Sequence, residues 1–317
     1  MTVHSTRRHL LTAFGASGLV LGAAACGSSD PFEEGDGGAG GSGGSDAGGA
    51  SSGSLAIGSQ AYYSNEIIAE LFAQVLEKAG LTVDRQYQIG QREVYMPELE
   101  AGSLDVMPEY LGNLLQHYDP DAGSASPEEI SASLTEALPE GLRVLAFAAA
   151  SDQDSYTTTS EFASAHSLTA IGDLAGVDEY LKIAANSEFE KRPYGPEGAK
   201  SVYGVDVTVV PVEDSGGPLT VQALLDGDVQ LADIYTADPT IAENDLVVLE
   251  DPESMILPQN VVPVVSEKVD ETAAAAIEEV IAQLSADDLV ELNRQSVVDQ
   301  ASSADIATGW LTDKGLL

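Results

Sequence analysis

Short apolar runs alternate with amphipathic helical stretches from residue 55 to residue 317, and this alternation restricts the chain to an α/β fold. A helix expected over 65–79 places Ile67, Leu71 and Val75 on one face, and Gly80 closes it. The expected strands are 55–58, 81–89, 104–107, 181–184, 205–212 and 231–235. The third of them is short and ends at Pro108. The other expected helices are 92–101, a helix-like stretch near 171–174, 219–225 and one long amphipathic helix over 273–293 that packs back on the first lobe.

Two similar sequence segments indicate that the fold has two similarly built lobes. Residues 99–106, LEAGSLDV, and residues 224–231, LLDGDVQL, each read as a helix that ends at glycine and is followed at once by a strand. Glycine is the usual residue at such helix ends because it adopts the left-handed conformation without strain. The stretch from Leu55 to Leu317 is long enough for one large domain or two lobes.

The N-terminus is typical of a secretory signal. An apolar run over Leu10–Ala25 has 16 residues, fewer than the ~20 that a membrane-spanning helix needs, and it follows Arg7 and Arg8. The small residues before Cys26 resemble the end of a bacterial lipoprotein signal, in which the cysteine is lipidated and becomes a membrane tether. A plain cleaved signal with an incidental cysteine is the alternative. The paired arginines also resemble a twin-arginine export signal.

The segment between this signal and the α/β body predicts a flexible stalk. Residues 27–54 are mostly Gly, Ser, Ala and Asp, which cannot bury enough apolar surface to offset the entropy of ordering. We therefore divide this region into a signal peptide over 1–25 and a lipidated cysteine with its linker over 26–54.

The charge of the chain excludes several classes of partner. With 52 acidic and 13 basic side chains, the net charge is −39. Nucleic acids and anionic lipid headgroups need clustered Lys and Arg, so neither is expected as a binding surface. Cys26 is the only cysteine, so no disulfide framework supports the fold.

Sequence signatures of catalysis are also missing. Beyond the signal, the chain has only His117 and His166, and neither has metal-ligand spacing to another residue. It has no phosphate-binding glycine loop, no dinucleotide fingerprint and no nucleophile elbow. We therefore expect a binding protein and not an enzyme, without a metal or a cofactor.

Four stretches resemble the substrate-binding lipoproteins of ABC importers for osmoprotectants, which take up glycine betaine, choline, carnitine and related quaternary amines. They are residues 57–62 (IGSQAY), 102–113 (GSLDVMPEYLGN), 234–238 (IYTAD) and 246–263. The resemblance implies a type II periplasmic-binding-protein fold, two lobes joined by two crossover segments with the ligand in the cleft. It places lobe I at 55–153 plus 258–317 and lobe II at 154–257.

The resemblance also implies an aromatic cage. A quaternary ammonium donates no hydrogen bond and is recognised by the faces of aromatic rings, each worth about 0.5–2 kcal/mol. The positions that match the cage tyrosines of the family are Tyr110, Tyr156 and Tyr235. The alternative for each of them is a structural role, as a half-buried core ring whose hydroxyl faces solvent.

Other positions complete the predicted pocket. Gln60 and Asn113 match polar positions that hydrogen-bond a ligand oxygen, and Asp154 supports the cage or positions Tyr156. Arg192 lies where the family places a basic residue that pairs with the carboxylate of betaine. An ordinary surface salt bridge with an acidic neighbour is the alternative. Gln259 stands where the family has a further tyrosine, so the cage would lose one ring. Either Tyr62 or Tyr63 takes the place of that ring, or the ligand is more polar than betaine.

Together these features predict a monomeric, lipid-anchored receptor on the outer face of the membrane. It would capture a quaternary amine and deliver it to an ABC permease with its ATPase subunits. A receptor of the same fold for an amino acid or a polyamine is the alternative. A surface-anchored enzyme or a sensor domain would need a nucleophile, a metal cluster or a signalling module that the sequence lacks.

Overall fold

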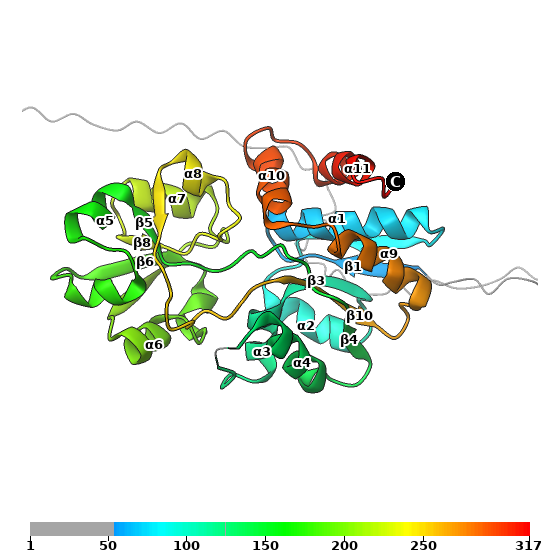
Figure 1. Cartoon of the computed structure of the whole chain (residues 1–317), viewed down its shortest axis with the longest axis horizontal. Coiled ribbons are helices and arrows are strands. Elements are labelled where there is room, and N and C mark those ends of the chain that lie inside the picture. Colours follow the sequence, from blue (N-terminus) through cyan, green and yellow to red (C-terminus); the bar gives the residue numbers. More distant parts are fainter. Residues whose placement is uncertain (1–53, 124) are drawn as a thin grey trace, which may run out of the picture. The chain divides into compact units, whose positions relative to one another are not determined.

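The computed structural model describes residues 54–123 and 125–317, which form two lobes with one five-stranded sheet each (Figure 1). The predicted signal peptide, the lipidation at Cys26 and almost the whole linker over 26–54 lie outside the described residues, so those assignments stay predictions. Within the described stretches, every helix is too short or too polar to cross a bilayer.

The sheet of the first lobe has the strand order β2-β1-β3-β10-β4. Its strands are β1 (Leu55–Gly58), β2 (Val83–Gln86), β3 (Val106–Tyr110), β4 (Leu142–Val144) and β10 (Val261–Ser266). β1 is parallel to β2 and β3, whereas β10 is antiparallel to β3 and β4. A strand from near the end of the chain therefore completes the sheet that the first strands begin.

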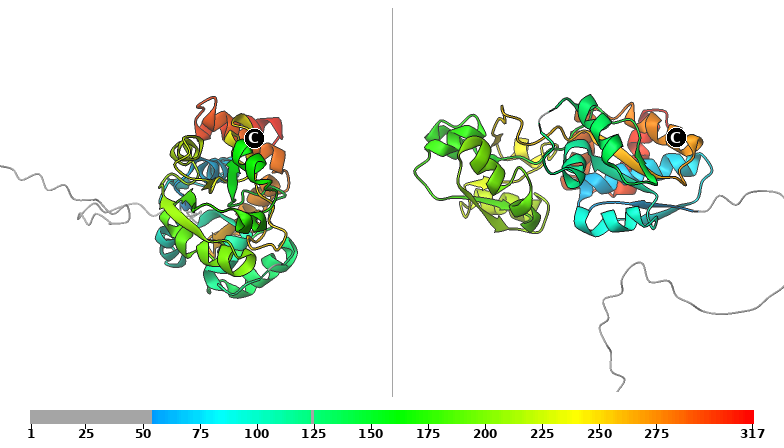
Figure 2. Two further views of the ribbon diagram at one scale, coloured as in Figure 1. Left: turned by 90° about the vertical axis from the view of Figure 1, so that its left-hand side faces the viewer. Right: turned by 90° about the horizontal axis from the view of Figure 1, so that it is seen from below.

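The second lobe is the green to yellow part of the chain in Figure 2. Its sheet has the order β7-β6-β8-β5-β9. Its strands are β5 (Thr157–Thr159), β6 (Leu181–Ala185), β7 (Val207–Pro211), β8 (Leu231–Ala232) and β9 (Leu246–Val248). β6 is parallel to β7 and β8, and β5 is antiparallel to β8 and β9. The predicted α/β fold is confirmed.

The chain passes between the two sheets twice, over residues 145–156 and 249–260. We call these the first and the second connection. The strand that follows each of them, β5 or β10, is the antiparallel strand of its sheet. The predicted lobe boundaries, at 153/154 and 257/258, fall inside these connections and stay predictions.

Helices cover both faces of the first sheet (Figure 1). On one face lie α1 (Tyr63–Lys78), α9 (Glu271–Ile281), α10 (Ala286–Val297) and α11 (Ser303–Asp313). On the other lie α2 (Arg92–Glu100), α3 (Leu111–Tyr118) and α4 (Pro127–Ala137). The apolar face predicted for the first helix is buried, since Ile67, Leu71 and Val75 belong to the core between α1 and the C-terminal helices.

The helices of the second lobe are shorter. They are α5 (Ser160–His166), α6 (Pro196–Gly198), α7 (Pro218–Leu225) and α8 (Thr240–Glu243), with single turns η1 (Ile171–Gly176), η2 (Ser187–Lys191) and η3 (Ala199–Tyr203). A core of apolar side chains lies between η1, η3 and the strands β6 and β7.

The repeated phrase of the sequence forms the same helix end in both lobes. Gly102 and Gly227 both have positive φ, of 77° and 75°. In each case the glycine N–H donates to the carbonyl three residues before it, and the next N–H donates to the carbonyl five residues before it. This is the Schellman arrangement, which satisfies the last carbonyls of α2 and α7 before β3 and β8 begin.

Three predicted strand ends were wrong. The third strand continues through Pro108 to Tyr110, because Pro108 lies opposite Pro263 of β10, a pair that needs no N–H from either residue. The second strand covers only 83–86, since Gln88 has a φ of 55° and leaves the extended conformation. β8 stops at Ala232, and the chain after it turns to the first connection, where the backbone N–H of Thr236 donates to the backbone carbonyl of Gln153.

The single helix predicted over 273–293 was also wrong. The chain forms α9 and α10, and Ser285 begins the second of them. The Ser285 hydroxyl accepts from the backbone N–H of Asp288 at 3.2 Å, and the Asp288 carboxylate accepts from the backbone N–H of Ser285 at 3.1 Å. This capping box starts a new helix inside a continuous amphipathic pattern. Both helices pack on α1, as expected of a stretch that folds back on the first lobe.

Gly112 gives a test of the packing between α3 and the second connection. A Cβ at this position would lie 2.5 Å from Leu257 Cβ and 2.9 Å from the Pro258 carbonyl oxygen. We expect Gly112→Ala to lower the free energy of unfolding by about 1–3 kcal/mol in urea denaturation. Gly309→Ala is the matched control, because no atom lies within 4 Å of its Cβ in α11 and alanine favours the helix. Equal effects of the two substitutions would contradict the close approach.

Candidate ligand-binding site

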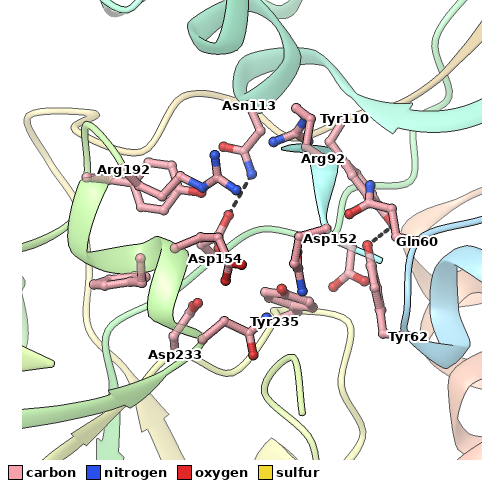
Figure 3. Close-up of a pocket in the computed structure, with 15 residues that line it drawn as sticks. Gln60, Tyr62, Arg92, Tyr110, Asn113, Asp152, Asp154, Arg192, Asp233 and Tyr235 are labelled. Atoms are coloured by element: carbon pink, nitrogen blue, oxygen red, sulfur yellow. Dashed lines mark hydrogen bonds between the residues drawn. The ribbon is translucent and has the colours of Figure 1, made fainter. Parts of the chain in front are cut away.

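A pocket of about 490 Å³, its open mouth included, lies where side chains of both lobes meet the first connection (Figure 3). Several of its residues stand at strand ends: Gln60 and Tyr62 follow β1, Tyr110 ends β3, and Asp233 and Tyr235 follow β8. The lining is Gln60, Tyr62, Gln91, Arg92, Tyr110, Asn113, Asp152, Asp154, Asn186, Glu188, Phe189, Arg192, Tyr194, Asp233 and Tyr235.

Three tyrosines form one aromatic group in this pocket. The hydroxyls of Tyr62 and Tyr110 are hydrogen-bonded at 2.6 Å. The rings of Tyr62 and Tyr235 meet edge to face, with centroids 5.1 Å apart and an angle of 64° between their planes. Tyr62 and Tyr110 are buried and Tyr235 is half-buried, so the group offers ring surface to the pocket from both lobes.

The second lobe adds two more rings. Tyr194 and Phe189 line the pocket and meet edge to face with centroids 5.8 Å apart. Tyr156, which the sequence placed in the cage, does not line the pocket. Its ring is fully buried in the core of the second lobe, and its hydroxyl donates to the backbone carbonyl of Tyr194 at 2.8 Å. Tyr156 thus supports the backbone of a ring that lines the pocket.

Three buried aspartates face the same space (Figure 3). Asp152 accepts from the Ser64 hydroxyl and from the backbone N–H of Ala237, both at 3.0 Å. Burial raises the pKa of Asp152 to about 7, and the charges of Asp238 and Asp154 add to the increase against these two hydrogen bonds.

Asp154 and Asp233 form the other acidic pair. Asp154 accepts from the side-chain amide of Asn113 at 2.7 Å, and Asp233 accepts from the backbone N–H of Ser155 at 3.0 Å. Burial, followed by the negative charge of Asp154, raises the pKa of Asp233 well above its usual value.

Both arginines of the pocket are paired with glutamates. Arg92 and Glu109 form a buried, two-pronged pair with N–O distances of 2.9 and 2.7 Å, and Tyr95 donates to the same carboxylate. Arg192 binds Glu93 across the two lobes at 2.7 Å. The guanidinium predicted to bind a ligand carboxylate is therefore engaged by a carboxylate of the protein.

The predicted polar residues fall into two groups. Gln60 and Asn113 line the pocket, and the Gln60 side-chain nitrogen is buried without a hydrogen-bond partner among the described residues. Gln259 is fully buried and does not line the pocket. It accepts from the backbone N–H of Asn113 at 3.0 Å and donates to its side-chain oxygen at 2.9 Å. In this structure Gln259 fixes the side chain that holds Asp154.

Sequence reasoning missed several pocket residues, among them Asp152, Asp233 and Tyr194. Asp233 interrupts the apolar run 231–234, and a carboxylate inside such a run is a signal that a site is near. Asp152 precedes the predicted Asp154 by two residues, and Tyr194 follows the predicted Arg192 by two. No group of three or more His, Cys, Asp or Glu in the described ranges is arranged to hold a metal ion.

Comparison with known proteins decides the family. Residues 53–313 match the model of the substrate binding domain of the ABC-type glycine betaine transport system. The chain belongs to this family. The curated glycine betaine-binding protein YehZ of Escherichia coli is 24% identical over 279 residues, which cover 82% of this chain and 90% of that protein.

Solved structures of the family share the fold. A glycine betaine/carnitine/choline ABC transporter structure aligns with a TM-score of 0.67 at 20% identity, covering 83% of this chain and 99% of the other. Lactococcal OpuAC, in its closed-liganded conformation with glycine betaine, aligns with a TM-score of 0.61 at 14% identity, covering 83% and 96%. The predicted periplasmic-binding-protein fold is thereby confirmed.

The buried ion pair between Arg92 and Glu109 gives a stability prediction. Glu109→Gln leaves the buried guanidinium of Arg92 without a counter-charge, and we expect a loss of about 3–5 kcal/mol in the free energy of unfolding. Glu291→Gln is the control: it breaks the exposed pair with Arg294, where the change should stay below about 1 kcal/mol. Urea denaturation of both variants measures this, and a loss at Glu109 no greater than at Glu291 would contradict the role of the buried pair.

Proposed function

We propose that this protein is the extracytoplasmic receptor of an ABC importer and that it captures a quaternary amine, such as glycine betaine or choline, between its two lobes. The observation that carries the proposal is the set of four tyrosines, Tyr62, Tyr110, Tyr194 and Tyr235, around one pocket that also holds buried carboxylates. Membership of the glycine betaine family supports the same ligand class.

The chemistry of the pocket suits a quaternary ammonium. Such a group is bulky and donates no hydrogen bond, so it gains from aromatic faces and from nearby negative charge in a site of low dielectric. Ring surface from Tyr110 in the first lobe and from Tyr194 in the second would contact opposite sides of the ligand. Binding would then hold the lobes together.

Contacts between the lobes support such a closure. Arg192 pairs with Glu93, and the Gln91 side chain donates to the Ser215 hydroxyl at 3.1 Å. Each bond joins α2 or the residue before it to the second lobe. The closed form, with the ligand enclosed, is the form that an importer's membrane subunits would recognise. Delivery would go to a permease with its ATPase, and the bond-making chemistry of transport would lie outside this chain.

The anchor is the remaining part of the proposal. Lipid on Cys26 would tether the receptor to the outer face of the membrane, and residues 27–54 would let it reorient near the permease. Palmitate labelling of the full chain and of Cys26→Ser, followed by fractionation, tests this anchor.

The buried aspartates favour a second candidate, a polyamine. Primary ammonium groups donate hydrogen bonds that Asp152, Asp154 and Asp233 would accept. Calorimetric titration with putrescine beside choline and glycine betaine separates the two ligands. Binding of putrescine alone would replace the quaternary amine in this proposal.

Replacing one ring tests the cage. Tyr235→Leu keeps the apolar bulk and removes the π face, so we expect the affinity for the bound quaternary amine to fall about 2- to 30-fold, the equivalent of about 0.5–2 kcal/mol. Tyr180→Leu is the control, because Tyr180 is 70% exposed and lies outside the pocket lining. Calorimetric titration measures both variants, and unchanged affinity in Tyr235→Leu would contradict the cage.

A further inference from the structure

The charges that line the pocket do not balance. Each of the two arginines is paired with a glutamate, Arg92 with Glu109 and Arg192 with Glu93. Among residues 54–123 and 125–317, no ion pair includes Asp152, Asp154 or Asp233. Three buried carboxylates therefore share one pocket without a cationic partner from the described chain.

Burial without a cationic partner strengthens the binding of a proton to a carboxylate. Removing an unpaired charge from water is so costly that the group binds a proton instead, and a second carboxylate nearby increases the cost. Asp154 and Asp233 both line the pocket. Burial raises the pKa of Asp233 well above its usual value and the negative charge of Asp154 raises it further, so Asp233 is the carboxyl group that holds a proton. The other acidic groups that line the pocket are Asp152 and Glu188, and its two cations, Arg92 and Arg192, are each paired with a glutamate.

A second observation points to the ligand. Gln60 is only 6% exposed and lines the pocket, and its side-chain nitrogen has no hydrogen-bond partner among the described residues. A buried amide N–H2 without an acceptor is costly, so a ligand oxygen is its natural partner. A hydroxyl fits this position best, because it accepts from Gln60 and can also donate to a carboxylate. A ligand carboxylate would accept from Gln60 but would place a further negative charge beside the aspartates.

We propose that the pocket selects a ligand of net positive charge with a hydroxyl group, as in choline, and that this cation enters in exchange for a proton held by the buried, unpaired carboxyl group of Asp233. The inference rests on the proposed function, since it assumes that the same pocket takes a quaternary amine. The ammonium supplies the missing counter-charge, Asp233 becomes ionised, and its proton leaves to solvent. A zwitterion such as glycine betaine brings no net charge and gains less from the exchange.

The direction of the pH dependence follows from linkage. Burial and Asp154 raise the pKa of Asp233 in the free protein, and a bound cation lowers it. Binding therefore releases a proton, and the affinity rises with pH as long as the free protein still carries that proton. Each released proton strengthens binding up to about tenfold per pH unit.

Calorimetry measures the exchange directly. Choline chloride is titrated into the protein at about pH 7 in phosphate and in Tris, whose ionisation enthalpies differ, and the difference in observed enthalpy gives the number of protons released. We expect about one proton per choline and an affinity for choline at least about tenfold above that for glycine betaine.

Two variants separate the acidic pair from general charge effects. Asp233→Asn replaces the carboxyl proton by an amide hydrogen. We expect the proton release to fall by about one proton per choline, leaving only what Asp152 releases near its pKa of about 7, and the preference for choline over glycine betaine to shrink about tenfold or more. Asp206→Asn removes an exposed carboxylate that pairs with Lys200 outside the pocket lining, and it should behave as the unaltered protein does. Circular dichroism of both variants checks that each is folded.

The outcomes distinguish this inference from the proposed function. Binding of choline without proton release, proton release that is undiminished in Asp233→Asn, or tighter binding of glycine betaine than of choline overturns the inference and leaves the quaternary-amine receptor intact. Absence of heat with both ligands overturns the two together.

Discussion

The site depends on one constraint: buried carboxylates line the pocket without a cationic partner from the described residues. The first connection brings Asp152 and Asp154 to the pocket, and the residue after β8 adds Asp233. The arginines that could neutralise them are held by Glu109 and Glu93 instead. A folded protein carries such groups at a cost to its stability, and a cationic ligand would recover part of that cost on binding.

Hydrogen bonds between the two lobes hold these carboxylates in position, and one group of them lies at one side of the pocket. Asp152 accepts from Ser64 of α1 and from the backbone of Ala237, and Asn293 of α10 donates to the Ala237 carbonyl at 3.0 Å. Tyr63 donates to Asp238 at 2.6 Å beside them. The segment after β8 is thereby docked on α1 and α10 of the first lobe. On the other side, Gln259 orients Asn113, which donates to Asp154.

Much of this fold was predictable because its local signals are strong. The helix ends at Gly102 and Gly227 were read from a repeated phrase, and the buried face of α1 from its periodicity. The errors arose where tertiary pairing overrides local preference. Pro108 continues a strand because Pro263 faces it. The helix start at Ser285 is different, because it has a local signal, the capping-box spacing to Asp288, which the continuous amphipathic pattern masks.

The site was less predictable, for physical reasons that particular residues illustrate. Seven of the nine predicted ligand contacts line the pocket, and Tyr156 and Gln259 lie one layer behind it. Position in a motif does not tell whether a ring faces the pocket or, as with Tyr156, the core of its own lobe. The pairing of Arg192 with Glu93 joins residues far apart in the sequence, so no local pattern could show that this guanidinium is engaged.

The most direct test of the account asks whether the pocket recognises positive charge. Choline and its neutral carbon isostere, in which a tert-butyl group replaces the trimethylammonium, have nearly the same shape and the same hydroxyl. If aromatic faces and buried carboxylates bind the ligand through its charge, calorimetric titration should show choline bound at least about 100-fold more tightly than the isostere. Equal affinities would show that shape and apolar contact alone drive binding, and would contradict the account.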